Sequence, residues 1–319
     1  MKISIGKLRG IQQCTSEHGT FTCLALDHRQ NLRRALNPAD PGSVSDADLS
    51  RFKLDVTAAL ADLGTAVLLD PEFSAAQAVE AHLIPKQTGL IVAVEATGYT
   101  GDPTARHGQI LPGWSVAKAK RMGADAIKLL VYYHPDAPTA GETETFVRQT
   151  AEQCQEYDLA MMLEPLSYTI DPAAKKLTSE EKRYVVTETA RRLTRLGVDV
   201  LKAEFPLDTA DPDESAWATV CAGITAASAT PWILLSAAVS FETYVQQIKA
   251  ACQAGAAGIA VGRAVWQEAV GMQGTARREF LDTTGRQRLA QLTGICNELA
   301  KPVNNFYSAE TPFDWYQTY

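Results

Sequence analysis

Eight short apolar runs recur along the chain, and each has the length of a β-strand. Longer stretches that mix apolar and polar residues separate them. Near-continuous hydrophobic strands are typical of a parallel sheet covered on both faces, and the stretches between them supply helical crossovers. The runs lie at residues 21–27, 65–70, 90–97, 126–133, 159–166, 198–206, 231–237 and 258–264.

The connecting segments carry helix signals. Ser45 and Asp48 form a capping-type start, and Gly64 ends that segment. Segments 114–122, 178–196 and 241–254 also stop at glycines, namely Gly123, Gly197 and Gly255. The repeating order is helix, glycine, strand.

Eight such units between residues 21 and 264 predict a single-domain (β/α)8 TIM barrel. A doubly wound open sheet is the alternative. That fold more often shows a glycine-rich dinucleotide turn after the first strand, and Asp27-His28-Arg29-Gln30 is no such turn.

We expect the barrel to span residues 21–300, with a further segment at each end. Residues 1–20 are predicted to form a short helix that closes the bottom of the barrel, on the strength of Ile3, Ile5, Leu8 and Ile11. Residues 301–319 form a tail rich in aromatic side chains: Phe306, Tyr307, Phe313, Trp315, Tyr316 and Tyr319. We expect this tail to dock on its own barrel or on a second subunit.

Composition limits the partners and the location. The 319 residues are 46% hydrophobic, enough for a large core, and carry a net charge of −7 without a block of Lys or Arg. This argues against nucleic acid and anionic membranes as partners. No window reaches the roughly 18 apolar residues of a spanning helix, so we expect a cytoplasmic protein. The six cysteines include no Cys-x-x-Cys pair, which argues against a zinc site and a disulfide framework.

Polar side chains gather where the predicted strands end. Barrel enzymes carry their active sites at this carboxyl-terminal face. Asp70 and Glu95 fit an interior ion pair as well as a catalytic role. The whole set is Asp27, Asp70, Glu95, Lys128, Glu164, Lys202, Glu204, Ser236 and Arg263.

Lys202 is the candidate nucleophile. It lies two positions before Glu204, so both side chains point to one face of an extended strand. An amine nucleophile must lose its proton, and burial together with a nearby cation such as Lys128 lowers its pKa. Glu164, with a pKa raised by partial burial, would give and take protons, and Asp27 would bind or deprotonate a substrate hydroxyl. The arrangement suits imine chemistry.

The last two strands end in residues that suit a phosphate group. Ser236, Ala237 and Ala238 follow the seventh run, and Gly262 and Arg263 follow the eighth. Barrels often bind phosphate at this place with backbone N–H groups. Gly262 lets the backbone approach closely, and Arg263 offers a planar fork for a dianion.

Eight motifs spread over the predicted strands are specific enough to compare with known families: Ala25-Leu26-Asp27-His28-Arg29, Leu68-Leu69-Asp70-Pro71-Glu72, Thr97-Gly98-Tyr99, Trp114-Ser115-Val116, Gly123-Ala124-Asp125-Ala126-Ile127-Lys128, Leu163-Glu164-Pro165, Gly197-Val198-Asp199-Val200-Leu201-Lys202 and Gly262-Arg263-Ala264. Together they resemble the class I tagatose 1,6-bisphosphate aldolase family, and they share features with the related sulfofructose-phosphate aldolases.

The resemblance implies metal-independent cleavage of a phosphorylated ketose into dihydroxyacetone phosphate and a three-carbon aldehyde, without a cofactor. The aldehyde would be glyceraldehyde 3-phosphate from tagatose 1,6-bisphosphate, or sulfolactaldehyde from the alternative substrate 6-deoxy-6-sulfofructose 1-phosphate. A homo-oligomer is expected. By matching position, Lys202 would form the Schiff base, Glu164 would shuttle protons, and Lys128 and Asp27 would support them. The residues expected to contact the substrate or its phosphate are Ser236, Ala237, Gly262, Arg263, Arg29 and His28.

Two positions depart from the family pattern. Bisphosphate members tend to have Gln where His28 stands and Gly where Ala238 stands. A Cβ at Ala238 disfavours positive φ and would shift the backbone donors for the phosphate. The identity of the substrate therefore stays open at this point.

Two other classes of function are alternatives. A metal-dependent lyase or isomerase would use His28, His134 and the carboxylates, although the five histidines show no His-x-x-x-His spacing. A sensor would bind a sugar phosphate without turnover. The presence of all three candidate catalytic residues, Lys128, Glu164 and Lys202, argues against a sensor without turnover.

Overall fold

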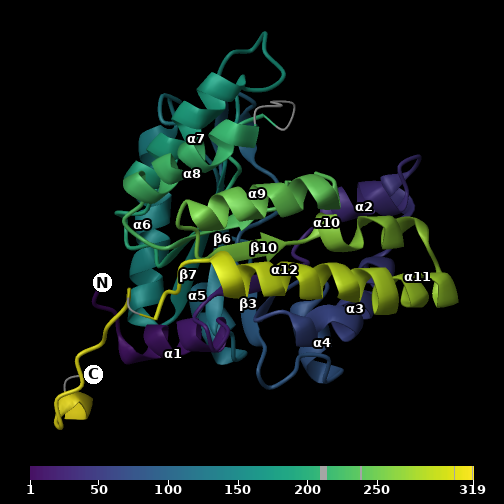
Figure 1. The fold of residues 1–319 in the computed structure, drawn as a ribbon, viewed down its shortest axis with the longest axis horizontal. Helices are drawn as coiled ribbons and strands as arrows, with labels where there is room; N and C mark the ends of the chain where they lie inside the picture. Colours follow the sequence, from purple (N-terminus) through teal and green to yellow (C-terminus); the bar gives the residue numbers. More distant parts are fainter. Residues whose placement is uncertain (209–213, 238, 305, 318) are drawn as a thin grey trace.

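The computed structural model describes residues 1–208, 214–237, 239–304, 306–317 and 319, which fold around a closed parallel barrel (Figure 1). The strand order around the barrel is β1-β10-β9-β8-β7-β6-β3-β2. This confirms the predicted (β/α)8 barrel. The barrel strands are β1 (Phe21–Ala25), β2 (Ala66–Leu69), β3 (Gly89–Ala93), β6 (Ala126–Tyr132), β7 (Ala160–Leu166), β8 (Val200–Ala203), β9 (Trp232–Leu235) and β10 (Gly258–Val261).

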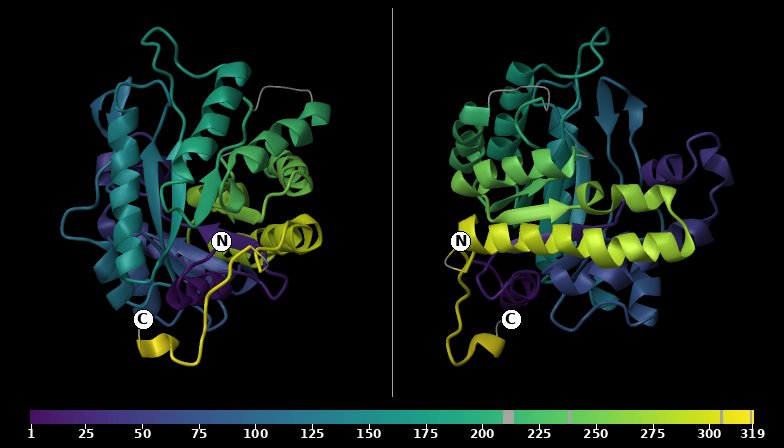
Figure 2. Two further views of the ribbon diagram at one scale, coloured as in Figure 1. Left: turned by 90° about the vertical axis from the view of Figure 1, so that its left-hand side faces the viewer. Right: turned by 45° about the vertical axis from the view of Figure 1, so that its right-hand side comes forward.

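Helices cover the outside of the barrel, as Figures 1 and 2 show. The short hairpin of β4 (Thr100–Asp102) and β5 (Ala105–His107) forms a separate two-stranded sheet. The helices are α1 (Ile5–Gln13), α2 (Gln30–Leu36), α3 (Asp46–Leu60), α4 (Ala75–Glu80), α5 (Val116–Arg121), α6 (Ala140–Glu156), α7 (Ser179–Leu193), α8 (Glu214–Ala227), α9 (Phe241–Gln253), α10 (Arg263–Trp266), α11 (Gly274–Phe280) and α12 (Arg286–Leu299).

Helices α3 and α7 each start with a complete capping box. Ser45 caps α3 and exchanges hydrogen bonds with Asp48, as the sequence predicts, and Thr178 and Glu181 do the same for α7. These bonds satisfy N–H groups that the first turn of a helix leaves without a partner. The helix starts are therefore fixed by local sequence.

Side chains alternate between the inside and the outside of the barrel. On β7, Ala160 and Met162 belong to the interior cluster, whereas Met161 and Leu163 pack against the helices. This period of two is the geometry of a strand. Glu164 lies two residues after Met162 and so also points into the barrel. The same spacing places Lys128 after Ala126 and Lys202 after Val200 on the inside.

The two ends of the chain pack together at the amino-terminal end of the barrel strands. Ile11 of α1 and Tyr307 of the tail both belong to the interior cluster. The chain ends also pair through a bridge between Lys2 and Ser308, and the Gly6 N–H donates to the Tyr319 hydroxyl at 2.9 Å. The aromatic tail thus contacts its own chain, although Phe313 is fully exposed.

A buried ion pair ties α1 to this end of the barrel. Lys7 Nζ lies 2.9 Å from Asp199 Oδ2, and the side chains are only 4% and 2% exposed. We expect Lys7→Met to lower the free energy of unfolding by about 3–5 kcal/mol, because Asp199 would remain buried without its cation. Urea denaturation at pH 7 measures this loss. A loss below about 1 kcal/mol, the range of an exposed pair, would contradict this role of the pair.

The structure also describes the cysteines and the apolar character of the helices, for which the composition gave expectations. All six cysteines are buried free thiols. Among the described residues, no helix combines the length and the apolar character that crossing a bilayer requires.

Candidate active site

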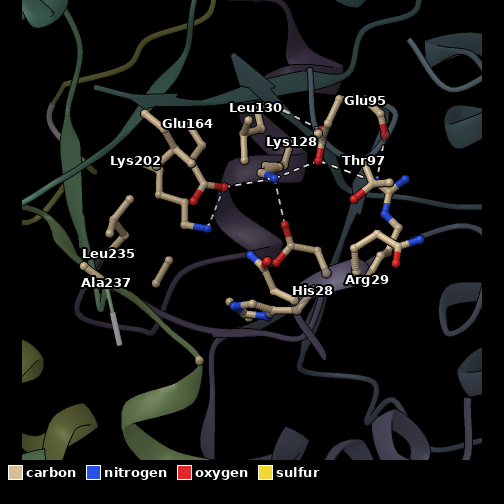
Figure 3. A pocket seen from close by; sticks show the side chains of 18 of the residues that line it. His28, Arg29, Glu95, Thr97, Lys128, Leu130, Glu164, Lys202, Leu235 and Ala237 are labelled. Carbon is tan, nitrogen blue, oxygen red and sulfur yellow. Dashed lines mark hydrogen bonds and ion pairs between the residues drawn. The ribbon is translucent and has the colours of Figure 1, made fainter. Parts of the chain in front are cut away.

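A cavity of about 590 Å³ opens at the carboxyl-terminal face of the barrel (Figure 3). All four residues predicted to be catalytic line it: Asp27 follows β1, Lys128 lies on β6, Glu164 on β7 and Lys202 on β8. The barrel therefore brings together side chains that are far apart in sequence. The cavity is also lined by all the predicted substrate-contact residues, Ser236, Ala237, Gly262, Arg263, Arg29 and His28.

Lys128 is the centre of an ionic network. Its Nζ lies 2.7 Å from Asp27 Oδ2, 2.8 Å from Glu95 Oε1 and 2.9 Å from Glu164 Oε2, and its side chain is 1% exposed. Figure 3 shows Glu95 and Glu164 on opposite sides of this ammonium group. Burying so many charges is tolerated because each has a close partner. Glu95 is thus part of the cavity network and not a separate interior pair.

Lys202 joins the network through Glu164. Its Nζ lies 2.9 Å from Glu164 Oε2, the same oxygen that Lys128 contacts. Glu164 therefore bridges the two lysines (Figure 3). Such a carboxylate is placed to exchange a proton with the Lys202 amine.

The charges of the network set the pKa values of its members. Burial opposes ionisation, but Lys128 and Lys202 outweigh it and hold the pKa of Asp27 well below its usual value and that of Glu164 below its usual value. Burial also opposes the charge on Lys128, yet its carboxylate neighbours raise its pKa well above the usual value. The prediction that the pKa of Glu164 is raised is therefore wrong, because the two lysines outweigh the effect of burial. At neutral pH this side chain is a carboxylate that can accept a proton.

Arg29 supports the network from the loop after β1. Its Nη1 lies 2.7 Å from Glu72 Oε2, and its Nη2 donates to the backbone oxygen of Glu95 at 2.7 Å. The same nitrogen lies 3.6 Å from Glu95 Oε1. Both terminal nitrogens of Arg29 thus have protein partners. Its contact with substrate stays a prediction.

The ends of β9 and β10 form a cradle of backbone and hydroxyl groups. The Gly262 N–H donates to Ser236 Oγ at 3.3 Å. A Cβ at position 262 would lie 2.9 Å from the carbonyl oxygen of Ala25, so the close approach requires glycine. Ala237 has a φ of 33°, which is uncommon for a residue with a Cβ. The expectation for Ala238 lies outside the described residues.

Arg263 and His28 lie beside this cradle. Arg263 lines the cavity and forms no ion pair with a carboxylate in the described part of the chain, and burial lowers its pKa. The His28 ring packs edge-on against Trp266 with centroids 5.3 Å apart. Burial lowers the pKa of His28 to about 4, so its imidazole is neutral at pH 7. Beside the cradle, Arg263 is therefore a cation available to meet an anion.

Comparison with known proteins identifies the family. The chain matches the model of the DeoC/LacD family aldolases over residues 21–268. It belongs to the DeoC/LacD aldolase family. Aldolases are lyases, so the chain is a lyase.

Two relatives agree with this assignment, and a solved structure shares the fold. The tagatose 1,6-diphosphate aldolase of Listeria monocytogenes serotype 4b is 30% identical over 327 residues, covering 95% of each chain. The tagatose 1,6-diphosphate aldolase 2 of Enterococcus faecalis is 31% identical, covering 92% of this chain and 95% of its own. An archaeal fructose 1,6-bisphosphate aldolase shares the fold with a TM-score of 0.62 at 19% identity, covering 92% of this chain and 99% of its own.

The two histidines that a metal-dependent mechanism would use in this DeoC/LacD aldolase, His28 and His134, have different neighbours. His28 packs on Trp266, whereas His134 Nδ1 accepts a hydrogen bond from the Asp136 N–H at 3.1 Å. Within the described ranges, no three His, Cys, Asp or Glu side chains are arranged to hold a metal ion. The carboxylates that the metal hypothesis would use surround the ammonium group of Lys128.

Two charged residues of the aldolase, Lys53 and Glu72, support the site from behind the cavity and were not predicted as site residues. Lys53 forms a fully buried ion pair with Asp70, which does not line the cavity. The sequence does contain a signal for Lys53. It lies four residues after Leu49 on the buried face of α3, and a lysine on such a face needs a charged or polar partner.

Proposed function

We propose that this aldolase forms a Schiff base on Lys202 and cleaves a ketose bisphosphate such as tagatose 1,6-bisphosphate. The products would be dihydroxyacetone phosphate and glyceraldehyde 3-phosphate. The observation that carries the proposal is the buried Lys202 amine at the cavity, 2.9 Å from Glu164 Oε2. An amine becomes a nucleophile when a base takes its proton, and Glu164 is placed to be that base.

The reaction then follows from the groups around Lys202. Its neutral amine attacks the ketose C2 carbonyl, and loss of water from the carbinolamine gives a protonated imine. Asp27 takes the C4 hydroxyl proton while the C3–C4 electron pair moves toward the imine nitrogen, which releases the aldehyde. The resulting enamine is protonated at C3, and water hydrolyses the imine to release dihydroxyacetone phosphate and Lys202. Glu164 carries protons in the steps at the nitrogen.

The substrate class rests on the relatives and on the cradle. Two relatives are named tagatose 1,6-diphosphate aldolases. Arg263, with the Ser236 hydroxyl and the backbone at Gly262, is suited to one phosphate of such a substrate. A neutral ketose would leave this guanidinium without a partner.

Arg263→Ala is expected to lower kcat/KM for tagatose 1,6-bisphosphate by about 10- to 100-fold. A hydrogen bond to a charged group contributes about 1.5–3 kcal/mol, and 1.4 kcal/mol corresponds to tenfold. Initial rates at varied substrate concentration measure the effect. Arg278→Ala, on the exposed surface of α11, is the matched control. An unchanged kcat/KM in Arg263→Ala would contradict the assigned phosphate contact.

The function itself is tested by release of dihydroxyacetone phosphate in the presence of a chelator. We expect cleavage of tagatose 1,6-bisphosphate to persist in excess EDTA, because the proposed electron sink is the imine. Fructose 1,6-bisphosphate and 6-deoxy-6-sulfofructose 1-phosphate, assayed in parallel, test the alternative substrates. Loss of all cleavage with EDTA and its return with a divalent metal would favour the metal-dependent alternative. Binding of these ketoses without cleavage of any would favour the sensor.

A further inference from the structure

A buried ion pair lies behind the cavity, and within the described part of the chain it forms no hydrogen bond or ion pair with Asp27, Glu164 or Lys202. Lys53 of α3 pairs with Asp70, which follows β2, and both side chains are completely buried. Ser74 adds a hydrogen bond from its Oγ to Asp70 Oδ2 at 2.8 Å. Two buried charges that bond to none of the reacting groups need a structural explanation, because an apolar pair of similar volume often fills such a site equally well.

Asp70 fixes the backbone of the turn that follows it. Its Oδ1 accepts hydrogen bonds from the N–H groups of Glu72 at 3.0 Å and Phe73 at 2.8 Å. One carboxylate thus holds Lys53 with one oxygen and the turn with the other. The position of Glu72 is set by this turn.

Glu72 then links the turn to the cavity. Its carboxylate lies 2.7 Å from Arg29 Nη1. Arg29 Nη2 in turn contacts Glu95, whose Oε1 lies 2.8 Å from Lys128 Nζ. A continuous chain of hydrogen bonds and ion pairs therefore runs from α3 to the lysine at the centre of the network (Figure 3 shows its last members).

We propose that Lys53 and Asp70 are positioning residues, which hold Glu72 and through it Arg29 so that Glu95 keeps its place between Arg29 and Lys128. The inference rests on the proposed Schiff-base function. Without the bond to Glu72, Arg29 keeps its bond to the Glu95 backbone oxygen, but its guanidinium is free to turn away from the Glu95 carboxylate 3.6 Å away. Lys128 would then interact more strongly with Asp27 and Glu164. Glu164 would be less available to accept a proton from Lys202.

The expected sign of the pH effect follows from the groups that face Glu95. These are Lys128 on β6 and, after β1, Arg29 and Asp27. Burial raises the pKa of Glu95, Asp27 raises it further, and Lys128 and Arg29 oppose the rise. Loosening Arg29 weakens that opposition, so Glu95 is protonated at a higher pH. The acid limb of the activity profile is expected to move to higher pH.

The test compares three variants of the full chain: Lys53→Met, Glu72→Gln and Lys7→Met. Glu72→Gln keeps the buried pair and changes a side chain that is 35% exposed, so it tests the link even where Lys53→Met fails to fold. Lys7→Met is the matched control, because it breaks another buried Lys–Asp pair at the opposite end of the barrel. Each variant is assayed for its thermal midpoint and for kcat/KM with tagatose 1,6-bisphosphate from pH 5 to 9.

We expect Lys53→Met and Glu72→Gln to move the acid limb to higher pH and to lower kcat/KM at pH 6 by up to about 100-fold, the scale of a small displacement in an active site. Lys7→Met should lower only the thermal midpoint. An unchanged pH profile in Glu72→Gln would overturn the inference, as would a lower midpoint without a pH effect in a folded Lys53→Met. Absence of any adduct between the wild-type chain, dihydroxyacetone phosphate and borohydride would instead overturn the Schiff-base function on which it rests.

Discussion

Lys202→Met is expected to lower kcat for ketose bisphosphate cleavage by on the order of 10⁴-fold or more. Methionine has a similar length but no amine, so neither the imine nor its electron sink can form. Removing a covalent nucleophile from an enzyme typically has an effect of this size. A coupled assay for dihydroxyacetone phosphate measures the loss.

The matched control for this prediction is Lys249→Met, which changes an exposed lysine of α9. It should keep the wild-type rate. Thermal unfolding measures whether Lys202→Met remains folded. We expect it to remain folded, because Glu164, the partner of Lys202, keeps its contact with Lys128. A folded Lys202→Met that retains more than about a tenth of the wild-type kcat would be incompatible with a nucleophilic role.

Lys128→Met is expected to impair both activity and stability. Asp27, Glu95 and Glu164 would lose their shared cation while remaining buried. Leaving a buried charge such as Asp27 without its close cation costs about 3–5 kcal/mol of unfolding free energy, and disturbing the proton transfer groups lowers kcat by about 10²- to 10⁴-fold. Urea denaturation and initial rates measure the two effects.

The loss of stability in Lys128→Met should depend on pH. Lys128 lowers the pKa of Asp27 and Glu164 in the folded chain. A lowered folded-state pKa gives stability that is present above the unfolded value, about 4, and is lost as the pH falls through the folded value. The gap in unfolding free energy between wild type and variant should therefore be largest near pH 7 and narrow below pH 4. A gap that stays constant over this range would show that Lys128 does not set these pKa values.

The inward side chains of the site could be predicted because a strand has a period of two. Lys128, Glu164 and Lys202 continue the interior positions of their strands, so a correct strand assignment already places them in the barrel. The capping residue Ser45 was predictable for a similar reason, since a capping box acts within a few residues.

Contacts between separate elements could not be predicted in the same way. Asp70 has the inward parity of Leu68, but β2 ends at Leu69 and the chain turns, so its carboxylate meets Lys53 of α3 instead of the cavity. The lowered pKa of Glu164 depends on two lysines from other strands that reach one oxygen. Such facts belong to the tertiary structure, because strand assignment fixes the face of a side chain but not its partner.

The central claim is that Lys202 forms an imine with the dihydroxyacetone half of the substrate. Mass spectrometry of the chain after incubation with dihydroxyacetone phosphate and borohydride tests it most directly, with Lys202→Met in parallel. We predict a reduced adduct on the peptide that contains Lys202 and none on that peptide in the variant. A wild-type chain that binds dihydroxyacetone phosphate but gives no adduct, or an adduct on a different lysine, would contradict the account.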